Sequence, residues 1–478
     1  MHLGSARSAL YPFLLARHTG GVFILRIEDT DQTRYVPGAE QELIDGLRWL
    51  GIHYDEGPDI GGPNGPYRQS ERKPIYQEYA WKLVELGHAF PCFCTPERLA
   101  RVRQEQLKNK QNPRYDGTCR NLDPVDVRTR IDADEPYVIR FRMPKEGTIT
   151  TVDLLRGPIV TENSALNDSV LVRSDGLPTY HLAAMVDDHL MGITHVIRGS
   201  EWLPSQPLHA HIIRAYGWEE PVFVHLSVFL KPSGKGKMSK REGAAQATQD
   251  GHSIFVKDIQ AQGYIPEGVL NWIVLMGWGV SQDDVLSLDE MIARFDVNSL
   301  TPSPAAINFS KLDHFNGTHI RLLPVDDLAQ RIKPYFLREG LAVDDATLLR
   351  IIPLIRERMV TLDDCIPFAA WFFEGHVEPL PQELVGKNLT PAQSAEVLCK
   401  TLEILSSLPG LTVEAAEPPM RKLVEDLGMS AGQVFGILRV AVTGQTVSPP
   451  LFESMEIVGK EKVLERVRQG IGLLEAMK

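Results

Sequence analysis

Strand-forming sequence is confined to the first two thirds of this chain, and this restriction narrows the folds open to it. Up to about residue 315, short apolar runs alternate with stretches of helical spacing, and glycines separate the two. Such alternation favours a parallel sheet covered by helices. From residue 316 to residue 478 the apolar spacing is helical, with proline-bearing joints between segments. We therefore expect an α/β region followed by an all-helical region.

The alternating part of the chain predicts particular elements. Apolar residues three and four positions apart predict four helices, over residues 5–18, 38–50, 74–86 and 207–215. Compact apolar runs predict three strands, over residues 22–27, 192–197 and 221–225. Between about residues 90 and 180, shorter alternating segments such as 137–143 indicate an inserted mixed or antiparallel module.

The composition excludes several classes of protein. With 43% hydrophobic and 23% charged residues, the chain is neither disordered nor fibrous. Its longest apolar stretch, residues 269–280, is interrupted by Asn271 and two glycines and is too short to span a bilayer. No basic segment followed by an apolar one opens the sequence, and five cysteines in 478 residues do not make a disulfide framework. We expect a cytoplasmic protein, with a monomer as the default.

The charge of the chain is acidic overall and basic in places. Fifty basic against 62 acidic residues give a net charge of −12, whereas nucleic-acid-binding proteins usually carry a basic excess. Any RNA or DNA partner must therefore meet local patches. Seven basic residues and two acidic ones lie between residues 98 and 120, and five basic residues with no acidic one lie between 231 and 241. Taken alone, the first patch is equally well explained as a solvated face.

Two short segments have the chemistry of a nucleotide site. His2, Gly4 and Ser5 stand where the first predicted helix begins, and the amino end of a helix attracts phosphate. By itself this motif is better explained as a local helix cap. Lys237 and Lys240 place compact positive charges on a glycine-bearing loop, where they can meet a triphosphate. A solvated basic loop is the alternative.

These segments resemble the paired signatures of class I aminoacyl-tRNA synthetases, as His2-Leu3-Gly4-Ser5 and Lys237-Met238-Ser239-Lys240-Arg241. The sequence between them resembles the bacterial glutamyl-tRNA synthetase family in motif order and spacing. The resembling stretches are RIEDTD at 26–31, GPYRQSER at 65–72, PTYH at 178–181, DDHLMG at 187–192 and VIRG at 196–199. The likeness continues to the end of the chain.

The resemblance implies a fold and a division of the chain. It implies a Rossmann-like parallel sheet in two halves, residues 1–90 and 181–242, of which the second carries the lysine loop. An inserted α+β module at 91–180 would bind the acceptor end of tRNA. A stem-contact region at 243–315 and an all-helical anticodon-binding region at 316–478 would follow.

The resemblance also implies an activity, the ligation of glutamate to tRNA. With ATP and Mg²⁺, L-glutamate would become glutamyl-adenylate, and the glutamyl group would pass to the 3′ end of glutamate tRNA. Three alternatives stay open at this point. A glutaminyl-tRNA synthetase typically ends in β-barrels, a glutamyl-queuosine enzyme lacks the anticodon-binding region, and a tRNA-binding protein would have no catalysis at all.

Roles for single residues follow from the same resemblance. Glu28 would hold the substrate ammonium, and Tyr180 and Arg198 would line the amino-acid pocket, where the arginine fork suits a carboxylate. The structural alternatives are a half-buried sheet residue for Tyr180 and a surface charge for Arg198. The ATP-binding residues would be His2, Gly4, Ser5, Glu201, Leu230 and Lys240, and the catalytic residues His2, Gly4, Lys237 and Lys240.

Three cysteines of the predicted insertion form a candidate structural zinc site. Some relatives bind zinc there through a Cys-x-Cys pair, a third cysteine and a fourth ligand, and this chain supplies Cys92, Cys94 and Cys119. Asn121 stands where the fourth ligand often lies, so Tyr115 is the substitute we consider. Three reduced cysteines in a small core are the alternative.

The chain departs from the family at its beginning. The family normally starts with a strand just before the segment that opens this chain, and that strand would lie inside the sheet. Its absence is expected to leave unpaired backbone groups on both neighbouring strands. We therefore interpret the chain as written as a fragment or as wrongly started, and whether it is active, with every later motif present, stays open at this point.

Overall fold

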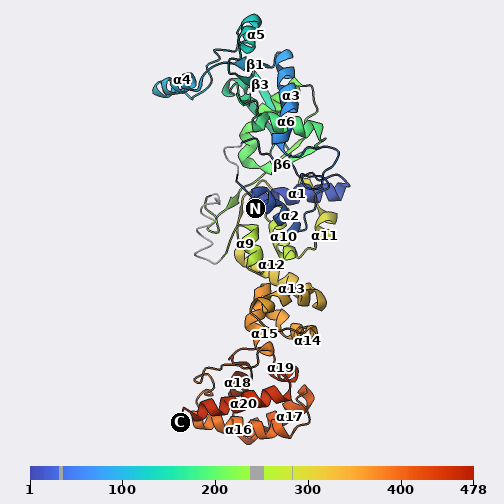
Figure 1. Ribbon diagram of the computed structural model, residues 1–478, viewed down its shortest axis with the longest axis vertical. Helices are drawn as coiled ribbons and strands as arrows, with labels where there is room; N and C mark the ends of the chain where they lie inside the picture. The colour runs from blue at the N-terminus through green and yellow to red at the C-terminus, as the bar shows by residue number, and fades with distance from the viewer. Residues whose placement is uncertain (32–35, 237–251, 282–283, 478) are drawn as a thin grey trace. The chain divides into compact units, whose positions relative to one another are not determined.

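The computed structural model describes residues 1–31, 36–236, 252–281 and 284–477 (Figure 1). The chain forms two compact units, one of residues 1–258 with 270–308 and the other of residues 259–269 with 309–478. No helix of the described residues is long and apolar enough to cross a membrane.

The first unit is built on a four-stranded sheet in the order β4-β3-β7-β6. Its strands are β3 (Thr148–Asp153), β4 (Gly157–Glu162), β6 (His195–Gly199) and β7 (Val222–Leu226). Strands β6, β7 and β3 run parallel, and β4 pairs antiparallel with β3. The predicted strands at 192–197 and 221–225 are therefore confirmed as β6 and β7, and the sheet is mixed because β4 returns from β3 through a short turn.

All four predicted helices of the first unit are present. They are α1 (Leu3–Thr19), α2 (Ala39–Trp49), α3 (Lys73–Glu85) and α7 (Gln206–Ala215). The first unit also contains α6 (Tyr180–Leu190), which was not predicted. The sides of α3, α6 and α7 share one apolar core with the sheet, in which Tyr76, Leu182, Ile212 and Phe223 are buried. The spacing of apolar residues predicted these helices correctly because each helix buries one apolar stripe of its surface.

Residues 22–27, predicted as a buried strand, differ from that prediction. Ile24 and Ile27 form only isolated parallel bridges, to Glu56 and Arg68, and Val22 is 61% exposed. The backbone hydrogen bonds of this segment are made by residues 23, 25 and 27, whose polar groups share one edge because extended backbone directs alternate residues to opposite edges. Their partners come from two separate segments, residues 55–56 and 67–69, so no continuous ladder forms and the bridges stay isolated.

An antiparallel sheet forms the predicted insertion. Its strands β1 (Ala89–Cys92), β2 (Val138–Phe141) and β5 (Val170–Val172) lie in the order β1-β2-β5. Helices α4 (Pro96–Lys108) and α5 (Pro124–Asp132) are connected to it, and neither has a buried residue. Figure 1 shows α4 standing away from this sheet, and its packing against the insertion is limited to partly buried residues such as Leu99, which contacts the cluster of Phe90, Cys92 and Cys119.

The rest of the first unit and the second unit are mainly helical. The first unit also contains β8 (Phe229–Leu230), β9 (Ala305–Ala306) and α11 (Leu288–Arg294), and α9 (Val256–Ala261) and α10 (Pro266–Leu275) lie where the chain passes between units. The helices of the second unit are α12 (Phe309–Leu322), α13 (Val325–Arg338), α14 (Asp345–Ile355), α15 (Cys365–Phe373), α16 (Pro391–Ser407), α17 (Val413–Asp426), α18 (Ala431–Thr443), α19 (Leu451–Val458) and α20 (Lys460–Glu475). No strand occurs among the described residues from 309 onward, which confirms the all-helical prediction.

The last helix is tied into the second unit by a buried arginine. Arg466 of α20 is 2% exposed, and its guanidinium donates to the carbonyls of Trp371, Glu374 and Val442 at 2.8–2.9 Å. These carbonyls belong to the end of α15 and to α18, so one side chain satisfies acceptors from two other helices. Helix α20 also packs along α16.

Candidate active site

A cavity of about 760 Å³ lies between residues 23–28, β6 and the amino end of α1. Predicted site residues from distant parts of the sequence line it, namely His2, Gly4, Ser5, Glu28, Tyr180, Arg198 and Glu201. Leu230 does not line this cavity, although its neighbour Phe229 does. Lys237 and Lys240 lie outside the described residues. The structure thus brings together the predicted residues of the amino-acid pocket and most of those predicted to meet ATP.

The amino end of α1 is capped by a histidine. The Nδ1 atom of His2 accepts from the Gly4 amide at 2.9 Å, and a Cβ on Gly4 would lie 3.2 Å from that nitrogen. The amides of Ser5 and Ala6 donate to the His2 carbonyl, and the Leu3 amide donates to Ile254 O. All four amides of the first turn therefore have partners within the chain. The end of α1 therefore offers a ligand its dipole and side chains, because its first backbone amides are already paired.

Arg198 is buried and fully oriented, so the alternative of a surface charge is wrong. It is 9% exposed, and its Nη1 donates to the Tyr180 hydroxyl at 2.9 Å. Tyr180 is the first residue of α6, and its ring lies 4.3 Å from that of Trp202. The sheet alternative for Tyr180 is therefore also wrong. One wall of the cavity presents a fixed guanidinium beside two aromatic rings.

The opposite charge in the cavity comes from an acidic pair around Arg26. Glu28 accepts from Arg26 Nη2 at 3.1 Å, and Asp188 accepts from the same nitrogen at 2.9 Å. Desolvation in the cavity raises the pKa of Glu28, and the charge of Arg26 opposes that rise. Because Glu28 and Arg198 line the same space, the cavity suits a ligand with an ammonium and a carboxylate.

Glu201 lines the cavity from the short 3₁₀ segment Ser200–Ser205 that follows β6. A Cβ on Gly199 would fall 2.2 Å from Glu201 Oε2. Because that oxygen is the far end of a flexible side chain, a change of rotamer would relieve the clash, so Gly199 leaves room for the glutamate side chain without being required for its position.

Arg7 is a site residue that sequence reasoning missed. Its guanidinium donates to Met276 O at 2.9 Å and to Ser227 O, and it lies 4.0 Å from the centre of the Phe229 ring. Burial lowers the pKa of Arg7. The side chain joins α1 to the segments after β7 and α10. A signal was available, because a charged residue at position 7 stands in the buried stripe of α1.

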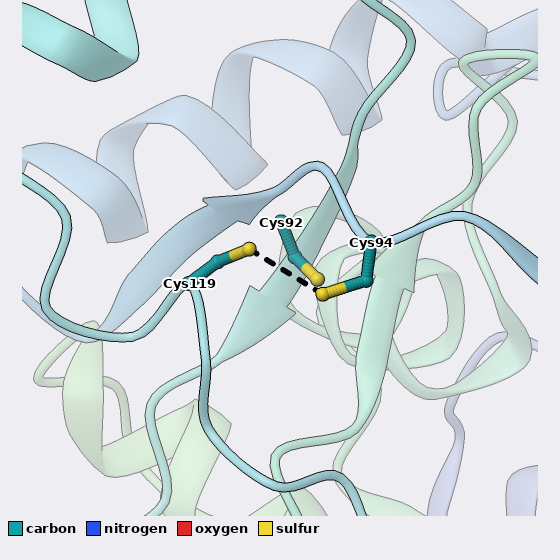
Figure 2. A group of neighbouring side chains, drawn as sticks. All are labelled: Cys92, Cys94 and Cys119. Atoms are coloured by element: carbon teal, nitrogen blue, oxygen red, sulfur yellow. Dashed lines mark hydrogen bonds between the residues drawn. The ribbon is translucent and has the colours of Figure 1, made fainter. Parts of the chain in front are cut away.

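The three cysteines of the insertion meet at one point (Figure 2). The sulfur atoms of Cys92, Cys94 and Cys119 lie within 4.8 Å of one another, and those of Cys94 and Cys119 are 3.5 Å apart. The Tyr115 hydroxyl lies 3.4 Å from Cys92 Sγ and 3.7 Å from Cys94 Sγ. The hydrogen bond with Cys119 lowers the pKa of the Cys92 thiol and raises that of Cys119. Asn121 is bonded elsewhere, to Arg142.

Comparison with known proteins identifies the family. Residues 1–314 match the family described as tRNA synthetases class I (E and Q), catalytic domain, and residues 327–471 match an anticodon binding domain. A glutamate–tRNA ligase of Chloroflexus aurantiacus is 41% identical over 492 residues, covering 99% of this chain and 96% of the relative. One of Ectopseudomonas mendocina is 40% identical, covering 99% and 93%. The chain belongs to the glutamyl-tRNA synthetase family.

Solved structures agree with this membership. A glutamate tRNA ligase from Elizabethkingia meningosepticum, crystallised with its amino acid, superposes with a TM-score of 0.90 at 35% identity, covering 99% of this chain and 97% of that chain. A glutamate-tRNA synthetase from Elizabethkingia anophelis gives a TM-score of 0.86 at 35% identity. The resemblance drawn from the sequence motifs is confirmed, and so is the class I catalytic fold followed by a helical anticodon-binding domain.

Proposed function

We propose that this protein is a glutamate–tRNA ligase that uses ATP to join L-glutamate to glutamate tRNA. The observation that carries the proposal is the single cavity in which Glu28 and Arg198 place opposite charges beside the amino end of α1. Relatives named glutamate–tRNA ligase over the full length of the chain support it. We place the reaction in the cytoplasm and expect a monomer.

The amino-acid pocket is assigned to three residues of this cavity. The Glu28 carboxylate would pair with the substrate ammonium, competing with Arg26. Arg198 would bind a substrate carboxylate, and the Tyr180 hydroxyl, which accepts from Arg198, would fix the guanidinium beside it. Selection of an acidic amino acid is assigned to Arg198 as the partner of the side-chain carboxylate, because every amino acid has an ammonium and an α-carboxylate, whereas an uncharged side chain would leave this buried guanidinium unpaired.

The nucleotide is assigned to the neighbouring part of the cavity. His2, Gly4 and Ser5 would lie along the phosphates at the amino end of α1, where the helix dipole favours negative charge. Glu201 and the backbone near Leu230 would meet the adenosine. Lys237 and Lys240, which lie outside the described residues, would meet the phosphates as pyrophosphate departs.

The proposed reaction has two steps. An α-carboxylate oxygen of glutamate attacks the α-phosphorus of ATP, forming the acyl-phosphate bond as pyrophosphate leaves. The terminal ribose hydroxyl of the tRNA then attacks the acyl carbon, forming an ester as AMP leaves. The residues of this chain act by positioning and by charge, without a covalent nucleophile. The phosphates are expected to carry Mg²⁺, which supplies further positive charge.

Helix α4 is the surface we assign to the acceptor end of the tRNA. It has no buried residue, and Arg101, Arg103, Lys108 and Lys110 on or just after it are all exposed. Arg98 and Arg120, at the two ends of the basic patch, are instead paired with Asp116 and Asp168. A helix that buries no side chain gains little from packing. Its exposed cations therefore fit a phosphate backbone better than a structural role.

The test of the proposed function is a charging assay with the full chain. With ATP, Mg²⁺, purified tRNA and radiolabelled amino acid, glutamate is expected to be attached and glutamine to be rejected. Glu28→Gln is expected to abolish most of the attachment of labelled glutamate to tRNA. Glu162→Gln, on the exposed face of β4, is expected to leave this attachment unchanged. Charging with glutamine would favour the glutaminyl alternative, and tRNA binding without any charging would favour a non-catalytic binding protein.

We also propose that Cys92, Cys94 and Cys119 hold a structural zinc ion, with the Tyr115 hydroxyl as the fourth ligand. Tetrahedral zinc–thiolate bonds of about 2.3 Å place the sulfur atoms just under 4 Å apart, close to the spacing of these thiols.

Elemental analysis of the purified protein tests this site. About one zinc per chain is expected in the wild type and in Cys399→Ser, which alters an exposed cysteine of α16. Cys119→Ser is expected to lose the metal and to lower the melting temperature of the first unit, since the ligands would no longer be linked. Wild-type protein without zinc, or Cys119→Ser with a full complement, would contradict the assignment.

A further inference from the structure

Behind Arg198 lies a buried polar network that the proposed reaction does not use directly. Asp153 ends β3, His225 is on β7 opposite Arg198 of β6, and His209 is on α7. Asp153, His209 and His225 are completely buried. Such residues are costly to bury unless their polar atoms have partners, and hydrogen bonds to Arg198 or to one another link all three.

The directions of these hydrogen bonds are fixed by Arg198, which can only donate. Its Nε donates to His225 Nε2 at 3.1 Å, so the proton of that imidazole must lie on Nδ1. His225 Nδ1 then donates to Asp153 Oδ2 at 2.8 Å. Arg198 Nη2 donates to His209 Nδ1 at 3.3 Å. His209 Nε2 accordingly donates to His181 Nδ1 at 3.0 Å.

The network leaves two N–H groups of Arg198 for a ligand. A guanidinium has five, of which His225, His209 and Tyr180 take three. One taken group is on Nε, one on Nη1 and one on Nη2. The two that remain are therefore one on Nη1 and one on Nη2, and both can donate to a carboxylate.

We propose that Asp153, His225 and His209 are positioning residues that set the direction of the Arg198 guanidinium and thereby the affinity for the amino-acid carboxylate. This inference rests on the proposed function and deepens it, because it assigns specificity to residues that touch no substrate. Without the two imidazole acceptors, Arg198 would rotate among several partners and would bind a carboxylate less tightly.

The electrostatics of the network agree with neutral histidines and an ionised aspartate. Burial and the charge of Arg198 lower the pKa of His209, and burial likewise lowers the pKa of His225. Burial opposes ionisation of Asp153, but hydrogen bonds from the side chain and backbone of His225 hold the pKa of Asp153 below its usual value. Arg156, which is paired with Asp153, adds positive charge nearby.

Asp153 cannot be replaced by its amide without a conflict. Its Oδ2 accepts from both the backbone N and Nδ1 of His225, and its Oδ1 accepts from Leu155 N and Arg156 Nη1. In Asp153→Asn, an NH₂ group in either position would face two donors. If it faces His225, the imidazole proton is driven to Nε2, where it meets the Arg198 Nε–H.

The test compares Michaelis constants in variants of the full chain. His225→Leu and Asp153→Asn are each expected to raise the KM for glutamate about tenfold or more, the loss expected when one hydrogen bond to a charged group is removed. The KM for ATP is expected to stay within about twofold of the wild type. His225→Gln keeps an acceptor for Arg198 and is expected to rescue the glutamate KM. His211→Gln, two residues after His209 on α7, is the matched control and is expected to behave as wild type.

The outcomes separate this inference from the proposed function. Absence of glutamate charging by the wild type would overturn the proposed function. Normal wild-type charging with an unchanged glutamate KM in His225→Leu and Asp153→Asn would overturn the positioning role alone. An equal rise in both KM values, or the same rise in His211→Gln, would also overturn it. Calorimetric titration with glutamate gives the same comparison without turnover, so an inactive or weakly folded variant does not end the test.

Discussion

Arg198→Leu is expected to lower kcat/KM for glutamate by about two to four orders of magnitude. Each hydrogen bond to a charged group contributes about 1.5–3 kcal/mol, and Arg198 has two N–H groups left for a carboxylate. Their combined loss of about 3–6 kcal/mol corresponds to that range of rates, because each 1.4 kcal/mol is tenfold. The leucine also leaves the substrate carboxylate in a buried wall without a counter-charge. Steady-state charging assays at varied glutamate concentration measure the effect.

Arg214→Leu is the control for this change. Arg214 lies on α7 in the same unit, is exposed, and pairs with Glu220 at 2.6 Å, so its loss is expected to leave the glutamate kinetics unaltered. Arg198→Leu with wild-type kcat/KM would contradict the assignment of the amino-acid pocket. A loss of the same size for ATP at saturating glutamate would indicate a general disturbance of the cavity.

Asp187→Ala is expected to lower the free energy of unfolding of the first unit by about 3–5 kcal/mol, the cost of breaking a buried ion pair from one side. Asp187 is fully buried in α6 and accepts from Arg72 Nε and Gln69 Nε2, both at 2.9 Å, and from the Tyr76 hydroxyl at 2.7 Å. Because Arg72 is only 3% exposed, its charge would lose its partner without gaining water. Urea unfolding followed by tryptophan fluorescence measures the loss.

Asp175→Ala provides the comparison for a surface carboxylate. Asp175 is 55% exposed and lies 3.4 Å from Arg173, an arrangement that contributes about 1 kcal/mol or less. If Asp187→Ala unfolded at the same urea concentration as Asp175→Ala, the buried group of Arg72, Gln69 and Tyr76 would not stabilise the unit as argued. The two variants remove the same side chain, so their difference isolates burial.

Sequence spacing predicted the helices well because burial of one stripe decides a helix locally. Helix α1 was predicted at 5–18 and lies at Leu3–Thr19, and the all-helical region after residue 315 was equally clear. Residues 22–27 were predicted wrongly as a strand, because an apolar run does not reveal whether the backbone meets one continuous partner strand. The cap formed by His2 was weighed as an alternative to an anion site, and the structure contains that cap.

The candidate site was only partly visible in the sequence. Glu28, Tyr180 and Arg198 were named because short motifs carried them, and the cavity that joins them is a property of the fold. The network of Asp153, His209 and His225 had no sequence signal, since its members come from separate strands and a helix and each looks like an ordinary polar residue. Buried hydrogen-bond chains of this kind depend on tertiary distances that no local spacing encodes.

The contacts of Arg466 have a consequence for how the protein is made. Helices α15 and α18 are synthesised before α20. The carbonyls of Trp371, Glu374 and Val442 therefore lack their donor, Arg466, until the end of the chain is made. Until then the helical unit lacks both this donor and the packing of α20 along α16. Residues 1–258 and 270–308 need nothing from that final helix to complete their own core. Nascent chains stalled before residue 460 should therefore carry a folded first half and a protease-sensitive second half on the ribosome.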